Sequence, residues 1–214
     1  MTGPGGAALG AEADPVDATL AAYQDGVAQY LRAGRYPGTA LATFLDRLAG
    51  LTAGGDVLEI GSGPGWDADY LESRGVRVTR TDATQAFVDR MRAAGHDARL
   101  LDVRRDPLGG PYQAVLALAV LLHLSRPQFK DAVQRARQAV LPGGTLAVTL
   151  KEGDGAAWTH EKLPMPRHFT YWREPGLRAA LAQAGWSVPS IEHVAGPTGP
   201  WLYVLARAAD PPLP

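Results

Sequence analysis

A run of apolar residues enters a short loop at Gly61–Gly65, which holds three glycines. A strand that passes into such a loop and then into a helix turns sharply and lets a ligand approach the backbone closely. Two classes of ligand compete for this loop. A dinucleotide fingerprint would need its third glycine at the position of Trp66, and the nearby carboxylate of Glu59 would repel a pyrophosphate. A cationic amino-acid head group would instead be attracted by Glu59.

Two further acids follow the next two predicted strands, Val76–Thr81 and Ala98–Leu101. An acid at the place of Asp82 can accept both hydroxyls of a ribose. Asp102 can accept from an adenine amine, while the backbone amide of Val103 faces a ring nitrogen. Acids near three successive strand ends therefore match a ligand built from an amino acid, a ribose and an adenine, without a phosphate. S-adenosylmethionine has these parts.

The elements that must position these residues alternate between strands and helices. Alternation of this kind predicts helical crossovers and a parallel sheet that is buried on both faces. Close spacing of the last two strands predicts a terminal antiparallel hairpin. The predicted strands are Asp56–Ile60, Val76–Thr81, Ala98–Leu101, Tyr112–Leu118, Thr145–Leu150, Trp186–Val194 and Trp201–Arg207, and the predicted helices are Pro15–Ala33, Thr39–Leu48, Trp66–Ser73, Thr84–Ala94, Ser125–Val140 and Arg173–Ala184.

With these features in this order, the sequence resembles the class I S-adenosylmethionine-dependent methyltransferases from Leu41 to Arg207. The glycine loop and the acids after the second and third strands occupy the places of that family's motifs. Leu118–Val120 is similar to the motif after strand four, which lies beside the methionine moiety. Leu141–Gly144 is similar to the turn before strand five.

The resemblance implies an α/β fold with a seven-stranded, mostly parallel sheet. Its implied strand order is 3-2-1-4-5-7-6, with strand seven antiparallel and helices on both faces. It also implies a site for S-adenosylmethionine, with S-adenosylhomocysteine as the product. The residues expected to bind this cofactor are Glu59, Gly61, Ser62, Gly63, Gly65, Asp82, Ala83, Asp102, Val103, Leu118, Ala119 and Tyr23.

His123 is the candidate catalytic base. It follows the fourth predicted strand by a few residues, at the edge where the methyl group should lie. The ordinary pKa of histidine suits proton removal near neutral pH, although a base is needed only when the acceptor is protonated. The alternative is a histidine that caps the next helix or packs under the adenine.

The long segment Lys151–Trp172 is the candidate substrate-binding element, because long loops in compact domains often carry function. Its aromatic, histidine and lysine side chains can line an acceptor pocket. The alternative is a packed loop that covers the sheet edge. The residues proposed to bind substrate are Lys151, His160, His168, Tyr171 and Trp172.

Four regions are expected along the chain. Residues 1–14 are a mobile tail, residues 15–50 an N-terminal helical lid, residues 51–208 the Rossmann-like methyltransferase domain, and residues 209–214 a second tail. Family members often close such helices over the cofactor, which is why Tyr23 joins the expected cofactor site.

Composition narrows the function further. The chain has 214 residues, which suffices for one α/β domain, and a net charge of -1, which disfavours a dedicated nucleic-acid binder. It has no cysteine, and its histidines and acids lack metal-ligand spacing, so we expect no metal site. The first residues lack the pattern of a signal peptide, and the run Ala114–Leu124 is too short to span a membrane. We expect a cytoplasmic protein that does not bind membranes.

The expected function is transfer of a methyl group from S-adenosylmethionine to an oxygen or nitrogen of a small molecule, such as a specialised metabolite. The alternatives are a protein or tRNA methyltransferase and a non-catalytic S-adenosylmethionine-binding protein. A nicotinamide-dependent reductase is disfavoured by the spacing of Gly65 and Trp66. The sequence leaves the acceptor and the oligomeric state open.

Overall fold

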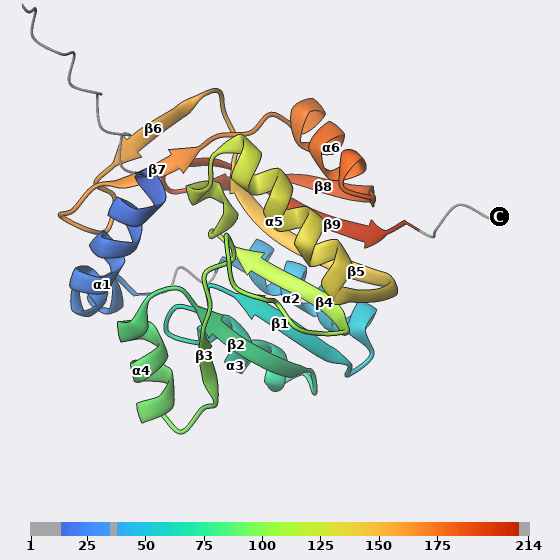
Figure 1. The fold of residues 1–214 in the computed structure, drawn as a ribbon, viewed down its shortest axis with the longest axis horizontal. Coiled ribbons are helices and arrows are strands. Elements are labelled where there is room, and N and C mark those ends of the chain that lie inside the picture. Colours follow the sequence, from blue (N-terminus) through green and yellow to red (C-terminus); the bar gives the residue numbers. More distant parts are fainter. Residues whose placement is uncertain (1–13, 35–37, 210–214) are drawn as a thin grey trace, which may run out of the picture.

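The computed structural model describes residues 14–34 and 38–209. Helices cover both faces of a central sheet (Figure 1). The strands of this sheet are β1 (Asp56–Ile60), β2 (Arg77–Asp82), β3 (Ala98–Leu100), β4 (Tyr112–Leu118), β5 (Val140–Lys151), β8 (Trp186–Gly196) and β9 (Gly199–Ala208). The helices are α1 (Pro15–Ala33), α2 (Thr39–Thr52), α3 (Trp66–Glu72), α4 (Gln85–Ala93), the 3-10 helix η1 (Leu121–His123), α5 (Arg126–Ala139) and α6 (Glu174–Gln183).

The strand order of the sheet is β3-β2-β1-β4-β5-β9-β8. Strands β1 to β5 pair in parallel, and β9 runs antiparallel between β5 and β8. Since β6 and β7 lie outside this sheet, β8 and β9 are its sixth and seventh strands. The expected order 3-2-1-4-5-7-6 with an antiparallel seventh strand is therefore confirmed.

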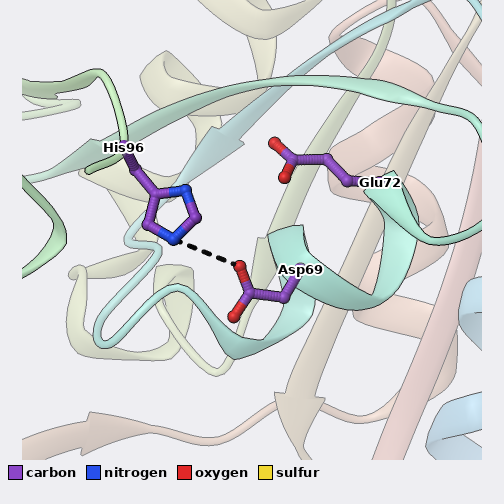
Figure 2. A group of neighbouring side chains, drawn as sticks. All are labelled: Asp69, Glu72 and His96. Carbon is purple, nitrogen blue, oxygen red and sulfur yellow. Dashed lines mark ion pairs between the residues drawn. The ribbon is translucent and has the colours of Figure 1, made fainter. Parts of the chain in front are cut away.

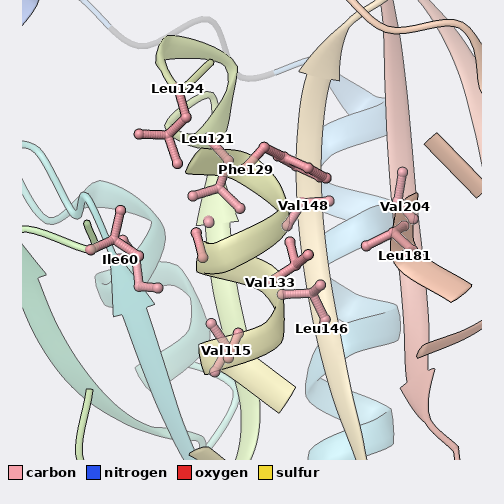
Figure 3. Packing of buried hydrophobic residues seen from close by; sticks show 14 of the residues in the cluster. Ile60, Val115, Leu121, Leu124, Phe129, Val133, Leu146, Val148, Leu181 and Val204 are labelled. Atoms are coloured by element: carbon pink, nitrogen blue, oxygen red, sulfur yellow. The ribbon is translucent and has the colours of Figure 1, made fainter. Parts of the chain in front are cut away.

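Alternate residues of the central strands face two separate cores. Val115 and Val148 point to the face that α5 and α6 cover, where they pack with Phe129, Val133 and Leu181 (Figure 3). The opposite face is covered by α2 and α3. There the core consists of Phe44, Leu45, Leu48, Val57, Leu71, Val76, Ala114, Leu116, Ala147 and Leu205. Burial on both faces explains why these strands read as continuous apolar runs.

A small hairpin lies in the segment that was expected to be a loop. It consists of β6 (Ala156–Thr159) and β7 (Arg167–Thr170), which pair antiparallel in a two-stranded sheet of their own. Each strand has only four residues. A strand this short gives no clear periodic signal in a polar and proline-rich segment. The expectation of a structureless loop was wrong here.

Helix α1 lies beside β7 and α4, over the edge where the parallel strands end (Figure 1). Its N-cap is Asp14, whose side chain accepts from the Val16 amide at 3.0 Å, and Pro15 occupies the first turn. Helix α2 instead packs into the sheet core. Within the described residues, no helix is both long and apolar enough to cross a membrane. Of the expected tails at 1–14 and 209–214, residues 1–13 and 210–214 fall outside the described residues, and Asp14 is the N-cap of α1.

Phe129 generates a stability prediction, because its ring is fully buried and lies 4.6 Å from that of Trp172. We expect Phe129→Ala to lower the free energy of unfolding by about 3–5 kcal/mol, through lost transfer energy and a cavity. Urea unfolding measures this change. The control Leu51→Ala alters a side chain that is 50% exposed, and should cost less than about 0.5 kcal/mol. Equal losses in both variants would contradict the assigned core.

Candidate functional site

A cavity opens at the edge of the sheet where the parallel strands end. Its wall is built from the ends of β1, β2 and β4, from α1, and from residues of the β6–β7 hairpin. The space between its wall atoms, counted out into the open mouth, is about 1100 Å³. Its wall combines apolar side chains with a few polar and charged groups, as is usual for sites that bind small molecules.

The glycine loop approaches the cavity without side chains. Gly61 has φ 71°, and a Cβ atom there would collide with the side chain of Val120. Gly65 has φ 91°, and a Cβ atom there would lie 2.6 Å from Nη1 of Arg80. Both positions need a left-handed backbone that glycine adopts without strain. The loop is therefore shaped by backbone sterics as well as by any ligand.

Asp82 joins this loop to the end of β2. One of its carboxylate oxygens accepts from the Gly63 amide and the other from the Thr84 amide, both at 2.8 Å. Burial raises the pKa of Asp82, while these backbone hydrogen bonds act in the opposite direction. Because each carboxylate oxygen can accept more than one hydrogen bond, Asp82 retains acceptor capacity on the cavity wall.

Glu59 lies behind the loop, with an exposed fraction of 2%. Its Oε2 atom has no hydrogen-bond partner among the described residues. Burial, and secondarily the negative charge of Asp67, raise the pKa of Glu59 to about 8. A nearby positive charge would therefore stabilise its ionised form.

Asp69, Glu72 and His96 form a cluster behind the glycine loop, with ligand atoms within 4.8 Å of one another (Figure 2). Arg80 pairs with both carboxylates, since its Nη2 atom lies 2.9 Å from Asp69 Oδ1 and 2.6 Å from Glu72 Oε2. Its Nη1 atom donates to the Gly65 carbonyl at 3.0 Å. The two carboxylates of the cluster therefore fix the Arg80 guanidinium, which supports the glycine loop through its hydrogen bond to Gly65. The expected absence of a metal site stays a prediction.

Asp102 is held by Arg104, whose Nη2 atom lies 2.7 Å from the Asp102 carboxylate. The same guanidinium pairs with Asp14 at 2.9 Å and with Asp17 at 2.7 Å, both at the start of α1. Arg104 is only 8% exposed. It therefore joins the loop after β3 to the first turn of α1, above the cavity.

A hydrogen-bonded chain links α1, η1 and β7 inside the cavity. The carbonyl of His168 can only accept, so Nδ1 of His123 donates to it at 2.9 Å. Nε2 of His123 then accepts from the Tyr23 hydroxyl at 3.1 Å, and the Tyr23 oxygen accepts from Nη1 of Arg167 at 3.0 Å. Burial lowers the pKa of His123 to about 4, so its imidazole is neutral at pH 7.

Most of the residues expected from the sequence meet at this cavity. Those on its wall are Gly61, Gly63, Asp82, Ala83, Asp102, Val103, Leu118, Ala119, Tyr23, His123 and Lys151. The others lie elsewhere. Trp172 is packed in the core, His160 is exposed, and the cavity wall also does not include Glu59, Ser62, Gly65, His168 or Tyr171.

Among the wall residues that were not predicted are Lys162, Arg167, Thr198 and Trp201. Lys162 and Arg167 belong to the segment Lys151–Trp172, which was proposed to bind substrate because of its aromatic and histidine residues. Their positive charges were the sequence signal that could have identified them. Thr198 lies in the turn between β8 and β9 and Trp201 lies near the start of β9, and nothing in their local sequence connects them to this edge.

Residues 31–191 match the family model described as a methyltransferase domain. No curated protein matches the chain significantly. Among solved structures, the complex of DhpI with SAH is 25% identical, with a TM-score of 0.76 over 93% of this chain and 99% of that chain.

Two further structures are similar. One is the 1,6-didemethyltoxoflavin-N1-methyltransferase of Burkholderia thailandensis, which is 20% identical, with a TM-score of 0.69 over 97% of this chain and 94% of that chain. The other is the magnesium protoporphyrin IX methyltransferase of Synechocystis, which is 15% identical, with a TM-score of 0.70 over 94% of this chain and 100% of that chain. These two identities establish likeness of fold.

His123 generates a prediction for the pH dependence of stability. Its folded-state pKa of about 4 lies below the ordinary value of 6.5. The contribution of neutral His123 to the stability of the folded state is therefore complete above pH 6.5 and is lost as the pH falls toward 4. Between pH 7 and pH 5 this group should reduce the free energy of unfolding by about 2 kcal/mol. Urea unfolding at both pH values measures the loss.

The variant His123→Gln should lose less stability over this range, because glutamine can form both hydrogen bonds and does not titrate. The matched control His160→Gln changes an exposed histidine and should retain the wild-type pH dependence. Identical pH dependence in wild type and His123→Gln would rule out this assignment.

Proposed function

The chain belongs to the methyltransferase domain family and is an S-adenosylmethionine-dependent methyltransferase, and we propose that it moves the methyl group to an oxygen or nitrogen of a small molecule, such as a specialised metabolite. The observation that carries this proposal is one cavity that joins the glycine loop and Asp82 to an end lined by polar side chains. Such a cavity is able to receive a cofactor and an acceptor side by side.

The residues on the cavity wall fit S-adenosylmethionine. Asp82 has spare acceptor capacity for the ribose hydroxyls, and the glycine loop leaves room for close approach of a ligand. Behind the wall, Glu59 has a buried oxygen without a hydrogen-bond partner among the described residues, which suits an attraction to the cationic amino group, directly or through water. The apolar side chain of Val103 lies where the adenine is expected. The carboxylate of Asp102 must serve the adenine amine while it also holds Arg104.

When bound, S-adenosylmethionine would supply a methyl group attached to a positively charged sulfur. The acceptor's lone pair would form the new bond to the methyl carbon, and the sulfur would keep the electrons of the broken carbon–sulfur bond. The protein's task is to align the acceptor and exclude water. Helix α1 helps to exclude water, because its residues Val16, Leu20 and Tyr23 line the cavity.

His123 remains our candidate for proton removal, and its hydrogen bonds define how it would act. Its Nε2 lone pair is occupied by the Tyr23 hydroxyl, so a proton from the acceptor would reach it through Tyr23. Its low pKa makes it a weak base. This arrangement suits an acceptor atom that needs little help in losing a proton.

The wider proposal places the protein in the cytoplasm, with an acceptor that is neither a nucleic acid nor a membrane component. The absence of cysteine and a net charge of -1 support it. Of the five residues expected to bind substrate, Lys151 lines the cavity. His160, His168, Tyr171 and Trp172 would act indirectly, by shaping the hairpin and its surroundings.

Calorimetric titration with S-adenosylmethionine, S-adenosylhomocysteine and NAD tests the proposal. We expect the wild-type protein to bind the first two and not NAD. Asp82→Ala should weaken S-adenosylhomocysteine affinity about 10- to 100-fold, because a charge-assisted hydrogen bond contributes about 1.5–3 kcal/mol. Binding of NAD alone would contradict the assignment of the glycine loop.

Two controls separate loss of a ligand contact from loss of fold. Asp89→Ala removes an exposed carboxylate from α4 and should leave the affinity unchanged. Asp82→Asn keeps the shape and one acceptor oxygen, and should fall between wild type and Asp82→Ala. Thermal unfolding shows whether each variant is folded at the temperature of the titration. Unchanged affinity in folded Asp82→Ala would refute the ribose assignment.

A further inference from the structure

The part of the cavity wall formed by the end of β5 and by the β6–β7 hairpin is rich in positive charge. Lys151, Lys162 and Arg167 line it, and Glu161 is the acid that accompanies them. They come from the end of β5 and from the β6–β7 hairpin. None belongs to the glycine loop or to the acid-bearing loops that follow β2 and β3.

Arg167 carries a buried charge without a counter-ion. Its side chain is 3% exposed and forms no ion pair with a carboxylate among the described residues. Nη1 donates to the neutral hydroxyl of Tyr23, and the guanidinium lies 5.4 Å from the Tyr23 ring and 5.5 Å from the Phe169 ring. Its Nε atom is buried with no hydrogen-bond partner. A buried cation in this state is costly unless a ligand supplies negative charge.

Lys151 is also 3% exposed. Its ammonium donates to the carbonyl and hydroxyl oxygens of Thr198, at 2.5 and 2.6 Å, and lies 4.7 Å from the Trp201 ring centroid. Both hydrogen-bond acceptors are neutral. The carboxylate of Glu161 lies 4.0 Å away and is 40% exposed, so it offsets this charge only weakly.

Lys162 brings a third positive charge to the same part of the wall. Burial is the largest cause that lowers the pKa of Lys162, and the charges of Arg167 and Lys151 lower it further. The three cations are therefore close enough to repel one another. Arg167 is fixed by Tyr23 and Lys151 by Thr198, so the protein holds these charges in place against that repulsion.

We infer that the acceptor carries an oxyanion, either a carboxylate or a phosphate-type group, which binds among Arg167, Lys151 and Lys162. This inference rests on the proposed function and names the substrate class of the same site. A guanidinium and two ammonium groups offer charge-assisted hydrogen bonds that an oxyanion accepts. A neutral acceptor would leave Arg167 and Lys151 buried without compensation.

The carboxylate of the cofactor is the competing occupant. It carries one negative charge, and because Glu161 offsets the Lys151 charge only weakly, this part of the cavity would stay positive with the cofactor bound. The test must therefore be made with the cofactor site filled. S-adenosylhomocysteine is suitable, because it retains this carboxylate and lacks the transferable methyl group.

The experiment is calorimetric titration of methylphosphonate and of acetate into the protein saturated with S-adenosylhomocysteine. Acetamide is the neutral match of acetate. We expect at least one of the two anions to bind and acetamide not to bind. Preference for methylphosphonate would assign a phosphate-type acceptor, and preference for acetate a carboxylate acceptor. Binding of acetamide as tightly as both anions, or binding of none of the three, would overturn the inference.

Variants tie the binding to these side chains. Arg167→Met and Lys151→Met should each weaken binding of the preferred anion at least tenfold, while affinity for S-adenosylhomocysteine changes less than threefold. Lys130→Met removes an exposed charge on α5 and should change neither. If Arg167→Met instead weakens S-adenosylhomocysteine and leaves the anion unaffected, the cations serve the cofactor and the inference fails. If the wild type does not bind S-adenosylhomocysteine, the proposed function itself fails.

Discussion

The buried carboxylate of Asp82 is the contact on which the cofactor end of the cavity depends. It joins the Gly63 amide to the Thr84 amide, and these belong to the loops that follow β1 and β2. Parallel pairing sets Ile60 beside Thr81, which brings both loops to the same edge of the sheet. A shift of one residue in this register would separate Asp82 from the glycine loop. The shape of the site is therefore a consequence of sheet register.

The other end of the cavity depends on the backbone of one residue, His168. Its amide donates to the Thr19 hydroxyl at 3.0 Å, and its carbonyl accepts from His123 at 2.9 Å. Helix α1, η1 and β7 are thus joined at a single peptide segment. Since these groups are shielded from water, moving α1 away would leave polar atoms unsatisfied or require water to enter. Helix α1 and the hairpin side of the cavity are therefore mechanically coupled.

The sequence predicted the elements that have local signals. The glycine loop and Asp82 follow from short motifs and the parallel sheet from the alternation of strands and helices, while the strand order follows from the family resemblance. The β6–β7 hairpin was missed because its strands are too short to show a period. Arg104 bonds to Asp14, 90 positions away, and His168 acts through its backbone, so neither role has a local signature. The sequence placed His123 near this edge, but its hydrogen bond to Tyr23 and the burial that lowers its pKa depend on tertiary packing.

The acids and the cations of the cavity come from different elements. Asp82 ends β2 and Asp102 follows β3, whereas Lys151 ends β5 and Arg167 lies in the β6–β7 hairpin. A cationic sulfonium is attracted toward the acids, and an anionic acceptor toward the cations, so the two partners are oriented before they meet. Low-dielectric walls strengthen both attractions. In this arrangement the protein accelerates transfer through alignment and electrostatics. Under the proposed function, cations around the acceptor would also lower the pKa of its reacting group, so that a base as weak as His123 would suffice.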